Sequence, residues 1–258
     1  MINLFLAELE RRWRLFKAYP MEEVASTFIF AVFFYGLFLG ASYMAGPAAA
    51  QFGQRLDAIV VGYVAWLLVI DAFQGIAAEV QNEAKTGTLQ QLIMSPHGTR
   101  VVFLVRSVAN LTVSVCVISC VLVLISLLTG SHVTFSPLVL LPVVTVIAGT
   151  LGLGFLIGAL ALTLKRVQIL VGVFNFVLLF MVMTPLETMG MGAKISMAFL
   201  PLVEGVSMLR TMMAQGGTFE TTSFLIATAN SAIWLLVGLT VFRRAEDRSK
   251  RRGSIAAF

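Results

Sequence analysis

The chain carries long apolar runs that water cannot solvate. A helix that crosses a bilayer needs about 20 largely apolar residues, at roughly 1.5 Å of rise per residue. Hydrophobic residues make up 59% of the chain and charged residues 12%, and the mean hydropathy is +0.93. Six runs are long enough: Val24–Ala45, Leu56–Glu79, Val101–Leu128, Pro137–Leu164, Val167–Leu186 and Ser223–Phe242. The sequence therefore predicts an all-α membrane protein with six transmembrane helices in one domain, residues 1–258.

The Lys and Arg residues are divided unevenly between the two sides of the predicted membrane. These residues collect in the cytoplasmic segments of membrane proteins. With both termini inside, only Arg55, Lys194 and Arg210 fall on the outer side. This division predicts a multi-pass protein of the plasma membrane with cytoplasmic termini. The net charge of +5 is then explained by topology and by membrane lipid headgroups as partners, and no nucleic acid is expected.

Both ends of the chain are expected to lie on the cytoplasmic surface. Residues 1–20 predict an interfacial amphipathic helix, because Leu4, Phe5, Leu9, Trp13 and Phe16 recur at helical spacing. Residues 243–258 form a basic tail, which predicts an electrostatic anchor on lipid; docking to another protein is the alternative.

Residue combinations that support catalysis are missing from the sequence. Cys116 and Cys120 lie in an apolar run and are interpreted as reduced packing residues, while His97 and His132 fall on opposite sides of the membrane. The chain has no Gly-rich phosphate-binding motif, and no apolar run pairs a nucleophile with a histidine. We expect no enzyme activity of its own, no metal site and no cofactor bound by this chain.

A polar insert, residues 83–96, separates the second and third apolar runs. Thr88 and Gln91 have the spacing of a capping box, which predicts a helix that begins near Leu89. Leu89, Leu92 and Ile93 would share one apolar face before Ser95-Pro96 ends the helix. A helix of about two turns is unstable alone in water, so this face is expected to dock against a partner.

The insert resembles the loop after the second span in the ABC transporter type-2 permease family. The residues that carry the resemblance are Glu79, Glu83, Gly87-Thr88-Leu89, Leu92 and Ser95-Pro96. A second block, Phe199–Arg210, resembles the outer segment before the last span, although the family often has Asn-Pro where this chain has Leu200-Pro201.

The resemblance implies a transmembrane permease subunit of an ATP-driven exporter in a bacterial inner membrane. The expected partners are two copies of a cytoplasmic ATPase subunit, which bind ATP and Mg, and a second permease copy. That copy would form a homodimer, with a heterodimer as the alternative. The insert would be the coupling helix, and Leu92→Glu is expected to abolish stimulated ATPase activity without unfolding the permease. The residues expected to transmit movement are Glu83, Thr86, Gly87, Thr88, Leu89, Gln91, Leu92 and Ile93.

Several residues outside the insert are also candidates for function or close packing. Asp71 lies within an apolar run, where it either pairs with Arg106 or lines the transport pathway. Ala193–Arg210 predicts short re-entrant or interfacial helices, with Glu204 and Arg210 as a local pair. Pro201 belongs to the same outer segment. Paired glycines at 36 and 40, and at 154 and 158, predict close helix crossings.

The composition favours a hydrophobic or amphipathic substrate such as a drug or lipid, because aromatic residues suited to sugar stacking are few: three Trp and four Tyr. Export of a polysaccharide or glycolipid is the alternative. An ATP-independent secondary transporter and a membrane anchor for a complex also stay open, although Asp71 lacks an evident acidic partner and inverted repeats are not apparent.

Overall fold

The computed structural model describes residues 2–45, 53–88, 91–92, 94, 98–131, 133–164, 167–184 and 199–252. In these residues the chain forms helices and no strand, which confirms the all-α class. The elements are α1 (Ile2–Ala18), α2 (Pro20–Ala45), α3 (Gly53–Lys85), α5 (Thr99–Thr129), η2 (Pro137–Val139), α6 (Leu140–Leu164), α7 (Gln168–Met183), α9 (Val203–Ala214) and α10 (Thr221–Arg252).

In the described part of the chain, five helices are long and apolar enough to cross a membrane: α2, α3, α5, α6 and α10. Helix α7 is apolar but has 16 residues, which is about 24 Å of helix, less than the ~30 Å hydrocarbon layer. It ends at Met183 because Thr184, the residue before a proline, has extended backbone. The fifth predicted span, Val167–Leu186, is therefore a shorter helix than expected, and its last residues lie outside the described part.

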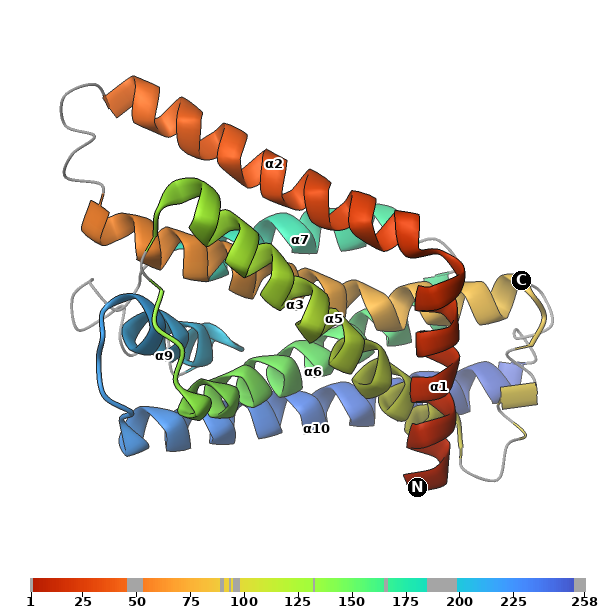
Figure 1. Ribbon diagram of the computed structural model, residues 1–258. Coiled ribbons are helices and arrows are strands. Elements are labelled where there is room, and N and C mark those ends of the chain that lie inside the picture. Colours follow the sequence, from red (N-terminus) through yellow and green to blue (C-terminus); the bar gives the residue numbers. More distant parts are fainter. Residues whose placement is uncertain are drawn as a thin grey trace.

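The long helices run broadly along one direction, and α1 crosses them at one end of the bundle (Figure 1). We call this the α1 end, and we call the opposite end, where α9 lies, the α9 end. Helices α3 and α6 form the centre of the bundle. In each of them 61% of the apolar stretch is buried, compared with 12% in α2. Helix α10 packs along α6, while α5, α7 and α9 pack on α3.

Glycines allow α6 to approach its neighbours closely. A Cβ atom on Gly238 of α10 would overlap the backbone of Gly152 of α6, and a Cβ on Gly152 would overlap the backbone of Trp234. Gly158 faces α3, where a Cβ would lie 3.0 Å from Ile76. The predicted close packing of this glycine-rich run is confirmed, as expected where small residues let helix backbones meet.

The corresponding prediction for α2 is wrong within the described residues. A Cβ on Gly36 or Gly40 would meet nothing within 4 Å. The physical reason is that α2 lies at the edge of the bundle, where much of its surface is exposed (Figure 1).

Helix α10 continues well past the predicted end of the last span at Phe242. The Phe242 ring lies edge-on to Phe103 and Phe155, and helix continues to Arg252. In this extension the buried Glu246 carboxylate accepts a hydrogen bond of 3.0 Å from Thr99 of α5 and lies 2.7 Å from Lys250 Nζ. The described part of the basic tail is thus a helix fixed to α5.

Candidate functional site

The predicted coupling residues begin with Glu83 near the end of α3, and Thr86, Gly87 and Thr88 form a tight turn after the helix. Thr86 and Gly87 donate backbone N–H groups to Asn82 and Ala84, at 2.9 and 3.3 Å. Gly87 has a φ of 72°, a left-handed conformation that glycine adopts without steric cost. The turn can therefore be traced to a single glycine, which stops α3 and redirects the chain.

The hydroxyl groups of this turn point back to α3. The Thr88 hydroxyl donates a short hydrogen bond to the Glu83 carboxylate, and the Thr86 and Thr88 hydroxyls are 2.7 Å apart. The Leu92 N–H then donates to the Thr88 carbonyl at 3.1 Å, which is a helical bond. The predicted capping box used the Thr88 side chain toward Gln91, whereas the contacts of the described residues use it toward Glu83.

The apolar face predicted for the coupling segment is only partly described. Leu89 and Ile93 lie outside the described residues. Leu92 is half-buried and packs against the chain's own hydrophobic core, so a charge at this position would disturb the fold as well as a partner. Gln91 and Met94 are exposed, Met94 by 84%. Among the described residues from 91 to 94, these two side chains are the exposed ones that a partner could contact.

Glu83 also belongs to a charge cluster that joins α1, α3 and α5. The Arg106 guanidinium of α5 lies 2.7 Å from Glu83, 3.3 Å from Glu8 and 3.9 Å from Glu79. Its side chain is 13% exposed, so these interactions are weakly screened by solvent. We call Arg106, Glu8, Glu79 and Glu83 the α1-end cluster.

Further polar groups extend this cluster on both sides. Asn110 donates a hydrogen bond of 2.8 Å to Glu79, and Arg11 donates one of 2.7 Å to Glu8. The connection therefore runs from the turn at Thr88, through Glu83 and Arg106, to α1. In the sequence, Glu8 stands out only as one member of the polar face of a helix, so its partner 98 residues away is visible only after folding.

The expected pair between Asp71 and Arg106 is corrected by this geometry. Arg106 lies at the level of Glu79 and Glu83, and Asp71 precedes Glu83 by 12 residues on α3, or about 18 Å along the helix. The pair was suggested by the fact that the two helices follow one another in the sequence. In the structure the two side chains lie at different positions along the bundle, too far apart to pair.

Asp71 lines a hollow of about 410 Å³ between α2, α3 and α5. Arg12 of α1, Gln74 of α3 and Ser114 of α5 line the same hollow. Charged and neutral polar groups thus line a space within the bundle, the arrangement expected if Asp71 lines a pathway. That role stays a prediction.

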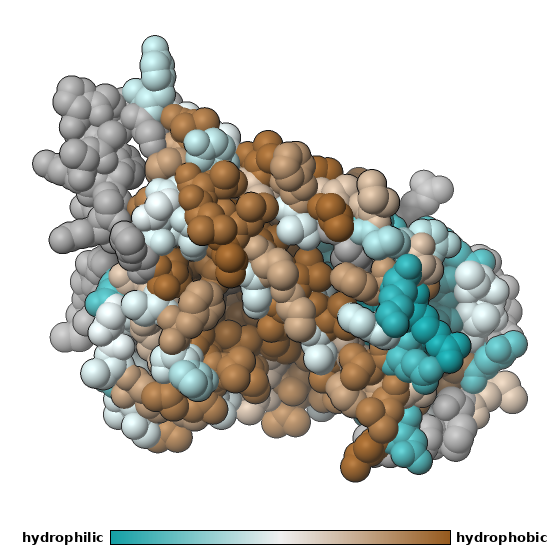
Figure 2. Space-filling view, viewed as in Figure 1, coloured by the Kyte–Doolittle hydropathy of each residue, from teal (hydrophilic) through white to brown (hydrophobic). Residues whose placement is uncertain are grey.

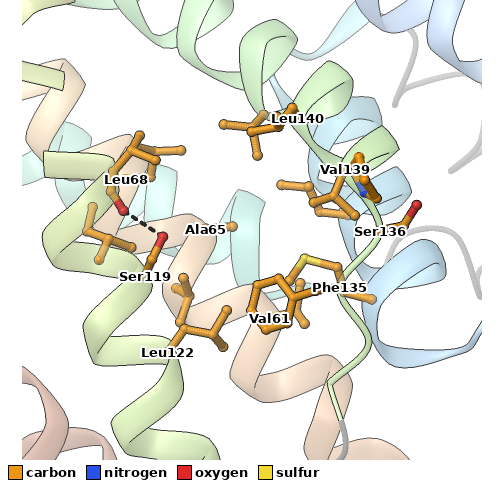
Figure 3. Close-up of a pocket in the computed structure, with 16 residues that line it drawn as sticks. Val61, Ala65, Leu68, Ser119, Leu122, Phe135, Ser136, Val139 and Leu140 are labelled. Carbon is orange, nitrogen blue, oxygen red and sulfur yellow. Dashed lines mark hydrogen bonds between the residues drawn. The ribbon is translucent and has the colours of Figure 1, made fainter. Parts of the chain in front are cut away.

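A mainly apolar cavity of about 440 Å³ lies nearer the α9 end, where α3 and α5 face the segment that leads into α6. Figure 3 shows Val61, Ala65 and Leu68 on one wall and Phe135 and Leu140 on another. The Ser119 hydroxyl, a polar group in the lining, donates to the Val115 carbonyl at 2.7 Å. Its hydrogen is therefore already used, and the cavity offers an apolar ligand mostly hydrocarbon contact.

The outer candidates gather around α9. Pro201 and Leu202 form a turn before the helix, Leu202 has a φ of 59°, and Glu204 lies in the first helical turn. The predicted range Ala193–Arg210 begins earlier than α9, and residues 193–198 lie outside the described part. The described segment is one short, largely buried helix.

Arg210 holds the end of α7 against α9. Its guanidinium is buried and donates to the backbone carbonyls of Val182, in a short bond, and of Thr184, at 3.3 Å. A Cβ on Gly62 of α3 would lie 3.4 Å from this guanidinium. Arg210 therefore joins α9, α3 and α7, since a cation binds the free carbonyls at a helix C-terminus. Its predicted pair with Glu204 stays a prediction.

Polar and apolar groups are separated along the molecule. Figure 2 shows hydrophilic side chains gathered at the α1 end and apolar side chains over the middle of the face. Among the described residues, no group of three or more His, Cys, Asp or Glu side chains has an arrangement that could hold a metal ion.

Comparison with protein families gives a match over most of the chain. The family model described as ABC-2 type transporter matches residues 2–214, a range that includes the α1-end cluster, the turn and α9. The search of curated proteins finds no match to this chain.

Proposed function

The chain belongs to the ABC-2 type transporter family, and from this premise we propose that it is the permease subunit of an ATP-driven exporter in a bacterial inner membrane. ATP and Mg²⁺ bind in a separate cytoplasmic ATPase subunit, which supplies the energy. Two permease copies, as a homodimer, enclose the pathway, and two ATPase subunits bind beneath them. Closure of the ATPase pair on ATP moves the coupling segment and opens the pathway alternately to each side.

The observation that carries this proposal is the linkage of the coupling turn to three helices. Thr88 contacts Glu83 of α3, Glu83 contacts Arg106 of α5, and Arg106 contacts Glu8 of α1. A force applied at the turn is therefore shared by α3, α5 and α1. Charge-assisted hydrogen bonds are strong and directional, so they support movement of these ends as one unit.

A hydrophobic or amphipathic substrate fits the cavities better than a sugar polymer. The cavity of Figure 3 is lined mainly by Val, Leu and other apolar side chains. Burying the many hydroxyl groups of a sugar against such walls would leave them without hydrogen bonds, which is unfavourable. The charged hollow at Asp71 supplies a more polar stretch of the same pathway.

The coupling role can be tested at Met94, an exposed apolar side chain of the segment. We expect Met94→Glu to weaken retention of the ATPase subunit and to reduce its stimulated activity about tenfold, because burying an unpaired charge in an interface is costly. The measurement is co-purification followed by ATPase activity of the complex reconstituted in lipid.

A matched control is Met21→Glu, which makes the same change at a methionine that is 77% exposed near the start of α2. This variant should keep its ATPase subunit and its stimulated activity. Full coupling in Met94→Glu, with unchanged retention of the ATPase, would show that the segment does not carry the contact.

A further inference from the structure

Helix α10 carries a row of exposed arginines where it reaches the α1 end of the bundle (Figure 1). Arg244, Arg248 and Arg251 follow one another at intervals of four and three residues, so they lie on one face of the helix. We call them the α10 arginine row. Within the described part of the chain, no carboxylate pairs with any of the three.

The opposite face of this part of α10 is fixed to the bundle. Phe242, Glu246 and Ser249 are buried there. The Glu246 carboxylate lies 2.7 Å from Lys250 Nζ and 3.8 Å from Arg100 Nε, so these two cations have a counter-charge inside the chain. The α10 arginine row lies on the other side of the helix, and its three charges face away from the bundle.

The face that carries the row is apolar farther back along the helix. Ile233, Val237 and Val241 precede Arg244 at intervals of four, four and three residues, and they are 60%, 41% and 38% exposed. Exposed apolar side chains on a spanning helix contact the hydrocarbon of the bilayer. One face of α10 therefore offers hydrocarbon contact and then cations, in the order in which a phospholipid presents acyl chain and phosphate.

The length of α10 places the row at the depth of the lipid headgroups. From Phe224 to Phe242 the helix rises about 27 Å, close to the ~30 Å hydrocarbon layer. Arg244 then lies at the edge of this layer, with Arg248 about 6 Å farther along the helix. The headgroup layer is about 5–7 Å deep on each side of a bilayer, so both guanidinium groups can reach lipid phosphates.

We propose that this face of α10 is a binding site for one anionic phospholipid, whose phosphate is held by Arg244 and Arg248 while an acyl chain lies along Val237 and Val241. A guanidinium donates two parallel hydrogen bonds to a phosphate. A zwitterionic lipid binds less well, because its own cation meets the row. The site replaces a diffuse attraction of the basic tail by one position with one occupant, and it does not depend on the proposed export function.

The test uses the full-length chain, purified in a nonionic detergent and observed by native mass spectrometry, which resolves bound lipids. Dioleoylphosphatidylglycerol and dioleoylphosphatidylcholine are titrated separately; they share acyl chains and differ in net charge. We expect one site per chain that binds the phosphatidylglycerol about tenfold more tightly. Arg248→Gln should weaken phosphatidylglycerol binding about fivefold, as expected for one cation near a lipid headgroup, and should leave phosphatidylcholine binding within about twofold.

Arg243→Gln is the matched control, because Arg243 is exposed and immediately precedes the row but lies about 100° around the helix from Arg244. Its phosphatidylglycerol affinity should stay within about twofold of the wild type. Equal loss in Arg243→Gln and Arg248→Gln would reveal a diffuse charge effect and overturn the site. Equal affinity of the wild type for the two lipids would overturn it as well.

The competing occupant of the α10 arginine row is an acidic surface of the ATPase subunit. Co-purification of that subunit with each variant separates the two. If Arg248→Gln loses the ATPase subunit but keeps the wild-type affinity for phosphatidylglycerol, the row contacts protein and the lipid site is wrong. Loss of phosphatidylglycerol selectivity with the ATPase subunit retained supports the lipid site.

Discussion

Arg106 provides one positive charge that faces three carboxylates in the α1-end cluster. Replacing it by Met keeps much of the side-chain volume but leaves Glu8, Glu79 and Glu83 close together without this counter-charge. Removing one partner from a largely buried ionic group costs about 3 kcal/mol or more. We therefore expect Arg106→Met to lower the free energy of unfolding by about this amount, measured as thermal unfolding in detergent.

Arg14→Met is the appropriate comparison, because Arg14 forms a 2.7 Å ion pair with Glu10 while both side chains are mostly exposed. Such pairs contribute less than about 1 kcal/mol. If the two variants unfold at the same temperature, the α1-end cluster does not stabilise the packing of α1, α3 and α5.

At the residue scale, the sequence indicated which residues matter better than it indicated their contacts. Thr88 was predicted to cap a helix with Gln91, but its hydroxyl bonds to Glu83 instead, because the left-handed Gly87 turns the chain back toward α3. The contact between Glu8 and Arg106 depends on how α1 crosses α5, and no local pattern encodes that crossing. A pair between Asp71 and Arg106 was one of two alternatives because both are charges in apolar runs, and sequence spacing within each run does not fix how far along the bundle each residue lies.

At the scale of helices, the sequence predicted position correctly where length and apolarity are sufficient to define a helix. Helices α2, α3, α5, α6 and α10 lie where long apolar runs predict them. Helix α7 is shorter than its apolar run because Pro185 follows Thr184 and limits the helix. The extension of α10 was missed because its composition is basic, and its helix is held by the tertiary contact of Glu246 with Thr99.

This contact predicts how firmly the extension is held. Glu246→Ala leaves the buried Thr99 hydroxyl without its acceptor, which costs about 1–3 kcal/mol. We expect trypsin to cut faster after Arg248 and Lys250, because cleavage requires local opening of the helix. The rate can be measured on inside-out membrane vesicles. Asp247→Ala, at an exposed neighbouring carboxylate, should not change it, and equal rates in the two variants would rule out the anchoring role.

The whole molecule is polarised by charge. At the α1 end the described basic side chains come from α1, from the ends of α3 and α10 and from the beginning of α5, whereas at the α9 end Arg210 alone represents them among the described side chains. An excess of Lys and Arg marks the cytoplasmic side of a membrane protein. The α1 end is therefore proposed to face the cytoplasm, where an ATPase would meet the coupling turn.

Labelling of single cysteines tests this orientation. With Cys116 and Cys120 replaced by Ala, Thr218→Cys would mark the α9 end and Arg248→Cys the α1 end, both at exposed positions. In intact spheroplasts a membrane-impermeant maleimide should label Thr218→Cys, whereas Arg248→Cys should react only after permeabilisation. The opposite pattern would place the coupling turn outside the cell, where ATP-driven movement could not reach it, and the export mechanism would have to be abandoned together with the topology.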